Sequence, residues 1–501
     1  MLRHSSSAFA FTALLTAALS AAYAAPTPAQ QSPAPKPDLD ARVRELAERC
    51  MQRSGANGLA LAVRSAGNEA LRLELGTLLP TADTKQPRVD ARALVEPLIA
   101  VAAWQQVAAG KWKPDQRMHA LAPELGLAES DATLAQFLAH TAGLANPFEL
   151  ATAEPKVLAL PLAEYAARIA ALPRATAPGE CFAYSDAHVY ALSVALAHAL
   201  AADQRAKPAE AGATAGGARG PNEPRALRGI GAVSAAAAAE RADARAWIAE
   251  HIVAAAGLDP ELLAPSEATQ RAFGWQRVGG ADHESCAAHA LGPLRFELTL
   301  DELARLGEAL ATEQVLAADA WNRMSEPARE RDGVLRRVAH GVTLAPLGEV
   351  PGYLMGGAVG ETRVHVALYP EARLALALAL DGPGAENGHS AAELERGVVR
   401  LLLGTQPPPT TPLPLPAEKR ATYLGIYGHG CDSYRVIERD EQLEFVPPRG
   451  DQVRLVHVGA HEFASAIDPE VRLKFRVVEG RVADEVVLDE HGVTSVLRRV
   501  P

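Results

Sequence analysis

Residues 137–144 read Phe-Leu-Ala-His-Thr-Ala-Gly-Leu, and residues 178–186 read Pro-Gly-Glu-Cys-Phe-Ala-Tyr-Ser-Asp. Either string alone has limited specificity. Four further strings stand in a matching order around them: Gly-Leu-Ala-Leu-Ala-Val at 58–63, Gly-Lys-Trp at 110–112, Leu-Thr-Leu-Asp-Glu-Leu-Ala at 298–304 and an apolar stretch at 364–380. Because these strings extend over roughly residues 38–404, chance similarity of one motif does not explain them, and together they decide the fold.

The strings resemble the signatures of class C β-lactamases and penicillin-binding-protein-like serine hydrolases. In that family the first string reads Leu-Leu-x-His-Thr-Ser-Gly-Leu. The second reads Pro-Gly-x-x-Phe-x-Tyr-Ser-Asn and carries a catalytic tyrosine, which corresponds to Tyr184 here. The resemblance implies an α+β fold over residues 39–405: a β-lactamase/transpeptidase-like antiparallel sheet flanked by helices, with a helical subdomain. The cleft between sheet and subdomain is then the expected site.

The nucleophile of the family is replaced. Counting back from Gly110 along the family helix puts its serine position at Ala93 and its lysine position at Glu96. Pro97 supports this register, because proline is tolerated in the first turn of a helix and many members have a proline after the lysine. In the active relatives that the chain resembles, the serine attacks a carbonyl and the lysine helps to take its proton. Alanine has no nucleophilic atom, and the sequence contains no Ser-x-x-Lys at any position.

The third family motif, a lysine or histidine followed by x-Gly on a strand lining the pocket, falls within residues 353–360. Leu354 takes the polar position, and leucine cannot hydrogen-bond to a substrate. Gly356 and Gly357 still allow close approach of the backbone. We expect these glycines, together with Ser185, to line the pocket.

Tyr184 is retained, and Asp186 stands where the family has asparagine. A tyrosine acts as a general base near neutral pH only if a neighbouring charge lowers its pKa, and the expected cation is missing. We therefore favour a buried structural tyrosine over a catalytic one. Glu96 and Asp186 make the cleft about three charges more negative than in the family, which disfavours penicillin-like anions. Two solvated carboxylates are the favoured interpretation, and a bound cation or metal is the alternative.

Other reactive side chains have simpler interpretations. We interpret Ser185 as a turn residue and His140 as a histidine that packs a loop. Cys181 could pair chemically with His188, but a cysteine beside Phe182 is more typical of a core or a disulfide. The cysteines are Cys50, Cys181, Cys286 and Cys431, and their three possible full pairings stay open. His429, Cys431 and Asp432 are interleaved with glycines, which favours a solvated turn, so no metal and no cofactor are predicted.

The N-terminus has Arg3, an apolar stretch at 8–19 and Ala-Tyr-Ala at 22–24. This pattern predicts a cleaved secretory signal over residues 1–24 and therefore a periplasmic or secreted protein. A flexible leader over 25–38 follows. No other apolar stretch approaches the roughly 20 residues that cross a bilayer. The formal net charge of −11 disfavours nucleic acid and anionic membranes as partners.

Composition divides the remainder of the chain. Residues 202–242 are rich in Ala, Gly, Pro and Arg, which predicts a disordered insertion. Six prolines between 406 and 416 predict a semi-rigid linker. Short strand-like stretches then recur over 417–501 and predict an antiparallel barrel. This segment resembles the small lipocalin-like domain appended to some penicillin-binding-type hydrolases, and we favour a packing role over ligand binding.

The functional hypothesis follows from the degenerate motifs. We expect an exported member of this family that no longer forms an acyl-enzyme and that binds a ligand or an envelope partner. A small-molecule or peptidoglycan-related ligand fits this hypothesis. The alternative is an active periplasmic hydrolase of esterase, β-lactamase or D-Ala peptidase type with an unrecognised nucleophile. A scaffold that engages a partner through the Ala-rich insertion or the barrel is a third possibility.

Overall fold

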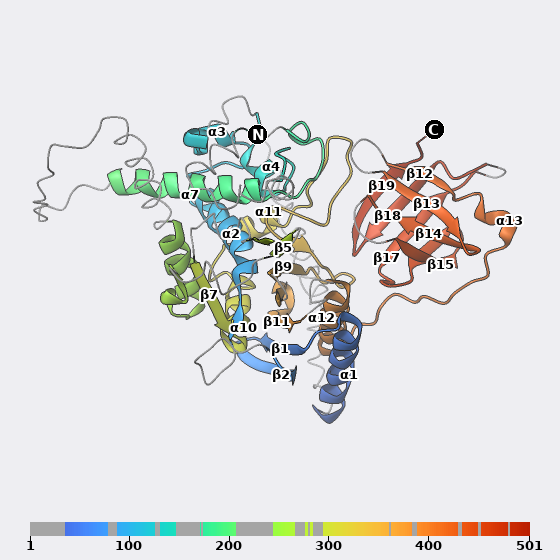
Figure 1. Ribbon diagram of the computed structural model, residues 1–501, viewed down its shortest axis with the longest axis horizontal. Coiled ribbons are helices and arrows are strands. Elements are labelled where there is room, and N and C mark those ends of the chain that lie inside the picture. The colour runs from blue at the N-terminus through green and yellow to red at the C-terminus, as the bar shows by residue number, and fades with distance from the viewer. Residues whose placement is uncertain are drawn as a thin grey trace, which may run out of the picture. The chain divides into compact units, whose positions relative to one another are not determined.

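A six-stranded antiparallel sheet forms the centre of the larger domain, in the order β2-β1-β11-β10-β9-β8 (Figure 1). The computed structural model describes residues 36–78, 88–125, 131–146, 171, 174–206, 244–265, 276–278, 281–283, 294–359, 362–382, 388–428, 433–448, 452–478 and 481–500. The strands are β1 (Gly58–Ser65), β2 (Asn68–Gly76), β8 (Thr343–Leu344), β9 (Tyr353–Val359), β10 (Thr362–Tyr369) and β11 (Leu374–Asp381). Successive residues of a strand point to opposite faces, and β11 is buried along its whole length because both of its faces are covered.

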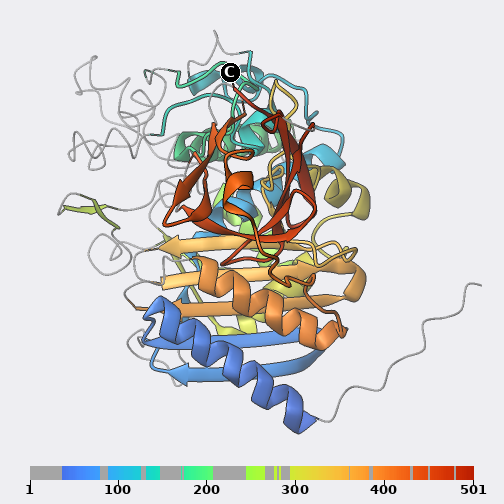
Figure 2. The same cartoon turned by 90° about the vertical axis from the view of Figure 1, so that its right-hand side faces the viewer.

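Helices α1 (Lys36–Ser54) and α12 (Gly388–Leu403) lie side by side across one face of the sheet (Figure 2). Leu46 of α1 packs so closely on Gly397 of α12 that a Cβ there would come within 2.9 Å of it. Arg53 forms an ion pair with Glu393. The first turn of α1 lies inside the segment 25–38, which was predicted as a flexible leader. The helix begins earlier because Pro37 is compatible with a first turn.

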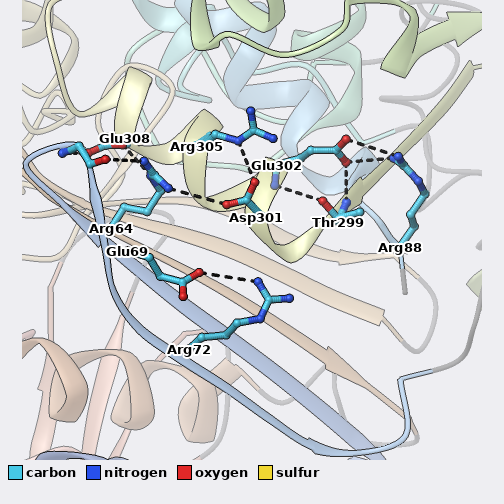
Figure 3. A network of polar contacts seen from close by, with 10 residues as sticks. Arg64, Glu69, Arg72, Arg88, Thr299, Asp301, Glu302, Arg305 and Glu308 are labelled. Carbon is cyan, nitrogen blue, oxygen red and sulfur yellow. Dashed lines mark hydrogen bonds and ion pairs between the residues drawn. The ribbon is translucent and has the colours of Figure 1, made fainter. Parts of the chain in front are cut away.

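Helix α10 (Leu300–Leu310) packs on the opposite face, against β1, β10 and β11. Thr299 and Glu302 form a capping box at its start, in which each side chain accepts a hydrogen bond from the other residue's backbone N–H. Arg64 of β1 lies between Asp301 and Glu308, and Arg88 contacts Glu302 (Figure 3). These ion pairs fix α10 on the strands beneath it.

The helical subdomain is arranged around α2 (Val95–Ala108), in which 11 of 14 residues are buried. A helix that is apolar all round is an interior helix, and α2 contacts α7, α11 and β9. A 3₁₀ turn, η1 (Arg92–Leu94), precedes it, so the predicted helix start near residues 93–97 agrees with the structure. The surrounding helices are α3 (Met118–Leu121), α4 (Leu134–Leu138), α7 (Asp186–Ala206) and α11 (Ala318–Met324).

Smaller elements complete this domain. A three-stranded sheet has the order β3-β7-β4, and β5 pairs with β6. Helix α7 continues to Ala206, so the first residues of the predicted insertion 202–242 are helical, as their alanine content favours. The remainder of that insertion from 207, the predicted signal at 1–24 and Cys286 and Cys431 lie outside the described residues. The remaining elements are β3 (Arg88–Asp90), β4 (Leu263–Pro265), β5 (Gln276–Val278), β6 (Ala281–His283), β7 (Leu294–Thr299), η2 (Pro123–Leu125), η4 (Ala249–Val253), η5 (Ala254–Ala256), η6 (Pro260–Leu262) and η7 (Pro370–Ala372).

The C-terminal domain is an eight-stranded antiparallel barrel, as the sequence predicts. Its strands follow in chain order, and the two outer strands meet: Val500 N donates to Ile426 O over 2.8 Å, and Gly428 N to Arg498 O over 2.8 Å. Aromatic rings of Tyr423, Phe463 and Phe475 contact one another in its interior, which favours packing over a ligand cavity. The elements are α13 (Ala417–Arg420), β12 (Gly425–Tyr427), β13 (Tyr434–Arg439), β14 (Gln442–Val446), β15 (Val453–Gly459), β16 (Glu462–Ser465), β17 (Val471–Arg476), β18 (Glu485–Glu490) and β19 (Val493–Arg498).

The proline-rich segment 406–416 has no regular secondary structure. It runs against β15, where Leu413 N donates to His457 O over 2.8 Å. Within the described part of the chain, no helix has the length and apolar character needed to cross a membrane.

Candidate functional site

A pocket of about 390 Å³ lies where β9 meets the start of α2, the end of α4 and the segment before α7. Segments far apart in the sequence contribute to its walls, because the sheet and the helical subdomain meet here. The described lining residues are Arg92, Ala93, Glu96, Pro97, Leu138, His140, Phe182, Tyr184, Asp186, Val338, Gly341, Val342, Thr343, Leu354, Met355, Gly356, Gly357 and Ala358. The structure thus brings together Ala93, Glu96, Tyr184, Asp186 and Leu354.

The lining residues described above include no serine and no cysteine. Ala93 presents a methyl group at the position where the resemblance places the nucleophile. Thr343 and Tyr184 carry the hydroxyl groups of the described lining. An acyl-enzyme needs a nucleophile whose proton a neighbouring base can take, and Ala93 offers no such atom.

Glu96 is held by two donors. His140 Nε2 lies 2.9 Å from Glu96 Oε1, and the Tyr184 hydroxyl donates to Glu96 Oε2 over 2.8 Å. Burial by itself raises the pKa of this carboxyl group, but the interactions with His140 and the hydrogen bond from Tyr184 outweigh it and hold the pKa below its ordinary value. Glu96 is therefore a carboxylate at neutral pH, and its side chain remains 28% exposed to the pocket.

The hydrogen bonds behind Glu96 fix the tautomers of two histidines. The backbone N–H of Leu144 points to His188 Nε2 over 3.4 Å, so His188 carries its proton on Nδ1. His188 Nδ1 lies 3.2 Å from His140 Nδ1, which also accepts from the backbone N–H of Ser185 over 3.2 Å. His140 Nδ1 is thus an acceptor, and its proton is on Nε2, facing Glu96. Burial lowers the pKa of His188 well below its ordinary value, in agreement with a neutral ring.

Tyr184 and Asp186 have environments that oppose their ionisation. The hydroxyl end of Tyr184 packs against Glu96 and Asp186, and its desolvation there together with the charges of these two residues raises the pKa of Tyr184 well above its ordinary value, so its hydroxyl is a donor and not a base. Burial and the charge of Glu96 raise the pKa of Asp186 to about 7. The cleft is therefore less negative near neutral pH than the sequence indicated, because Asp186 is only partly ionised there.

The predicted burial of Tyr184 is wrong, since its side chain is 41% exposed. One face of its ring stacks on His140, with a centroid distance of 4.6 Å, and the hydroxyl points to Glu96 and Asp186. Tyr184 lies in the segment without regular secondary structure just before α7 and not within the packed helix.

Ser185 lies behind the pocket and does not line it, contrary to expectation. It is fully buried, and its hydroxyl donates to the carbonyl of Ala145 over 3.0 Å. Cys181 is disulfide-bonded and cannot serve as a thiol partner of His188. Cys50 is a free buried thiol, so all three full pairings of the four cysteines are excluded, because each of them includes Cys50.

The β9 wall carries the two predicted glycines. Gly356 has φ +109, and a Cβ there would lie 2.1 Å from the carbonyl oxygen of Val364 on β10. Leu354 pairs with Thr343 across the β8–β9 ladder. A leucine and a threonine thus occupy this wall where the family motif would supply a basic side chain.

Sequence reasoning missed His140, His188 and Thr343 as members of the site. His140 has φ +53, a left-handed conformation that histidine adopts more readily than most residues and that turns its ring toward Glu96. Its position in the string at 137–144 was the available signal. Within the described residues, no group of three or more His, Cys, Asp or Glu side chains could hold a metal ion.

The family model described as Beta-lactamase matches residues 43–400. The match covers more than half of the chain, so this protein belongs to the β-lactamase family. No curated protein matches the sequence.

Solved structures are similar to this chain at low identity, and the two with TM-scores of 0.50 or above share its fold. The octameric penicillin-binding protein homologue from Pyrococcus abyssi is 14% identical with a TM-score of 0.51, and the match covers 91% of this chain and 99% of that one. A D-amino acid amidase from Ochrobactrum anthropi SV3, complexed with L-phenylalanine amide, is 17% identical with a TM-score of 0.50, covering 73% and 99%. A class C β-lactamase in complex with cefoxitin is 13% identical with a TM-score of 0.46, covering 72% and 98%.

Proposed function

We propose that this protein is an exported β-lactamase-family member that has lost serine acyl-enzyme chemistry and uses its cleft to bind a ligand or an envelope partner. The observation that carries the proposal is the pair of positions 93 and 96. A methyl group stands at the nucleophile position, and the residue one helical turn later is a carboxylate already engaged by His140 and Tyr184. Removal of the nucleophile alone costs about 10⁶ in turnover in a well-studied serine hydrolase.

The cleft retains the features of a binding site. It is a concave pocket with apolar walls and a few oriented polar groups, which is the general character of small-molecule sites. Leu354 and the absence of a basic group at that wall position favour a ligand other than a penicillin-like anion. A small molecule or a peptidoglycan-related fragment fits these dimensions.

The test is incubation of the purified protein with a chromogenic cephalosporin, short-chain p-nitrophenyl esters and a fluorophosphonate probe. We expect no saturable turnover and no covalent labelling. Saturable turnover together with labelling at one residue would overturn the proposal and support the alternative, an active hydrolase with an unrecognised nucleophile. Thr343→Ala then tests the remaining aliphatic hydroxyl of the described lining, since labelling through Thr343 would disappear in that variant.

Export is a separate part of the proposal and has its own test. The sequence pattern at residues 1–24 supports it. Fractionation of cells that express the full chain, followed by N-terminal sequencing, should find a mature protein that begins near Ala25. Retention of the intact N-terminus in the cytoplasmic fraction would contradict it.

A further inference from the structure

Within the described residues, no Lys or Arg side chain forms an ion pair with the carboxylate of Glu96. His140 is the nearest basic side chain, but its Nδ1 accepts from the N–H of Ser185 and from His188, so a second proton on the ring would face two donors. Arg92 also lines the pocket, and its guanidinium group forms a two-pronged ion pair with Asp90, with distances of 3.0 and 2.7 Å. The negative charge of Glu96 therefore remains available to a ligand.

The carboxylate of Glu96 can accept further hydrogen bonds. Each carboxylate oxygen accepts one hydrogen bond, from His140 or from Tyr184, and a carboxylate oxygen can accept a second. Because Glu96 lines the pocket and its side chain is 28% exposed, a ligand in the pocket can reach the carboxylate. A ligand donor placed there would make a charge-assisted hydrogen bond.

The surroundings of this carboxylate are aromatic and apolar. The exposed ring of Tyr184 stands next to Glu96, and a cation over such a ring is attracted by its quadrupole. Leu138, Phe182, Leu354 and Met355 supply apolar surface around it. A pocket of about 390 Å³ with one anionic group, one aromatic face and apolar walls matches a ligand with a cationic head and an apolar body.

We propose that the cleft binds an organic ammonium ion, with the ammonium group donating to Glu96 beside the ring of Tyr184 and an apolar portion on the β9 wall. This inference rests on the proposed function, because it takes the cleft to be a binding site. The hydrogen-bonded series from Leu144 through His188 and His140 orients Glu96, so His140 and His188 are positioning residues.

The probes are phenethylammonium, its anionic counterpart 3-phenylpropanoate and neutral 2-phenylethanol, measured by calorimetry or ligand-observed NMR on the full mature chain. We expect the ammonium ion to bind at least about tenfold more tightly than either of the others. Glu96→Gln should weaken ammonium binding about tenfold to a hundredfold, the range of one charge-assisted hydrogen bond. The matched control is Glu313→Gln, because Glu313 is exposed and lies outside the pocket lining.

The outcomes separate this inference from the proposed function. Equal binding of the three probes, preference for the anion or no saturable ammonium binding at millimolar concentration would overturn the ammonium assignment. Those results would not affect the proposal that the protein has lost acyl-enzyme chemistry, because that proposal is tested by turnover and covalent labelling. Glutamine at position 96 can still accept a hydrogen bond from His140, so the variant should remain folded. A thermal melt of Glu96→Gln followed by circular dichroism should match that of the parent protein. Weaker ammonium binding by the variant is then due to the lost negative charge and not to unfolding.

Discussion

Asp186→Asn should make the protein more stable at alkaline pH than the parent chain. The pKa of Asp186 is raised from 3.8 to about 7 in the folded protein, because the side chain is buried and Glu96 is nearby. The hydrogen bond from Tyr184 partly opposes this rise. A raised carboxyl pKa means that the folded state retains a proton that the unfolded state has lost. Stability from this group is present below pH about 4 and is lost as the pH rises through about 7.

The magnitude follows from the size of the pKa shift. A difference of about three pKa units corresponds to about 4 kcal/mol once the pH is well above 7. Asp186 is only 5% exposed, so solvent does not reduce this value appreciably. Asparagine cannot ionise and still offers an oxygen to the Tyr184 hydroxyl. The free energy of unfolding of Asp186→Asn should therefore exceed that of the parent by an amount that grows from about zero near pH 4 to about 4 kcal/mol near pH 8.

The assay is urea denaturation of both proteins at a series of pH values between about 4 and 9, followed by circular dichroism. Asp319→Asn is the control, because Asp319 is an exposed aspartate that does not line the pocket. A difference between Asp186→Asn and the parent that does not change with pH would refute the reasoning, because the burial of the carboxyl group would then not raise its pKa.

Three further changes test other parts of the site. Ala93→Ser introduces a hydroxyl but no lysine, and the carboxylate of Glu96 that would have to take its proton already accepts hydrogen bonds from His140 and Tyr184, so we expect no fluorophosphonate labelling in a gel assay. Labelling of this variant at position 93 would contradict this reasoning. His188→Ala removes a fully buried ring that donates to His140, and urea unfolding near pH 7 should show a loss of about 2–4 kcal/mol. Gly356→Ala forces a Cβ toward Val364 O at φ +109 and should cost about 1–3 kcal/mol in the same measurement. Gly357→Ala is its control, because a Cβ there meets nothing within 4 Å, and equal losses in the two variants would contradict the steric argument.

The sheet was predicted through the resemblance of the motifs to the β-lactamase family. The helix that begins near Pro97 and the barrel also have local signals, which are the position of the proline and the recurring short strand-like stretches. The sequence also named residues from distant segments that the structure finds around one pocket: Ala93, Glu96, Tyr184, Asp186 and Leu354. Motif spacing within a family fold carries this information, since each motif sits at a fixed place on its helix or strand.

The protonation states and side-chain orientations in the pocket could not be predicted from the sequence. The pKa of Asp186 depends on burial and on the distance to Glu96, and neither quantity is visible in the order of residues. The orientation of His140 depends on a left-handed backbone dihedral and on the N–H of Ser185. Tyr184 was predicted to be a buried structural tyrosine because the expected cation is missing, yet its side chain is exposed at the pocket.

The hydrogen bonds of Glu96 also limit which side chains position 96 can hold. Lysine at position 96 would place an ammonium group against the Nε2–H of His140, and the backbone N–H of Ser185 prevents that histidine from moving its proton to the other nitrogen. An engineer who wished to place a serine and a lysine at positions 93 and 96 would therefore also have to change the surroundings of His140.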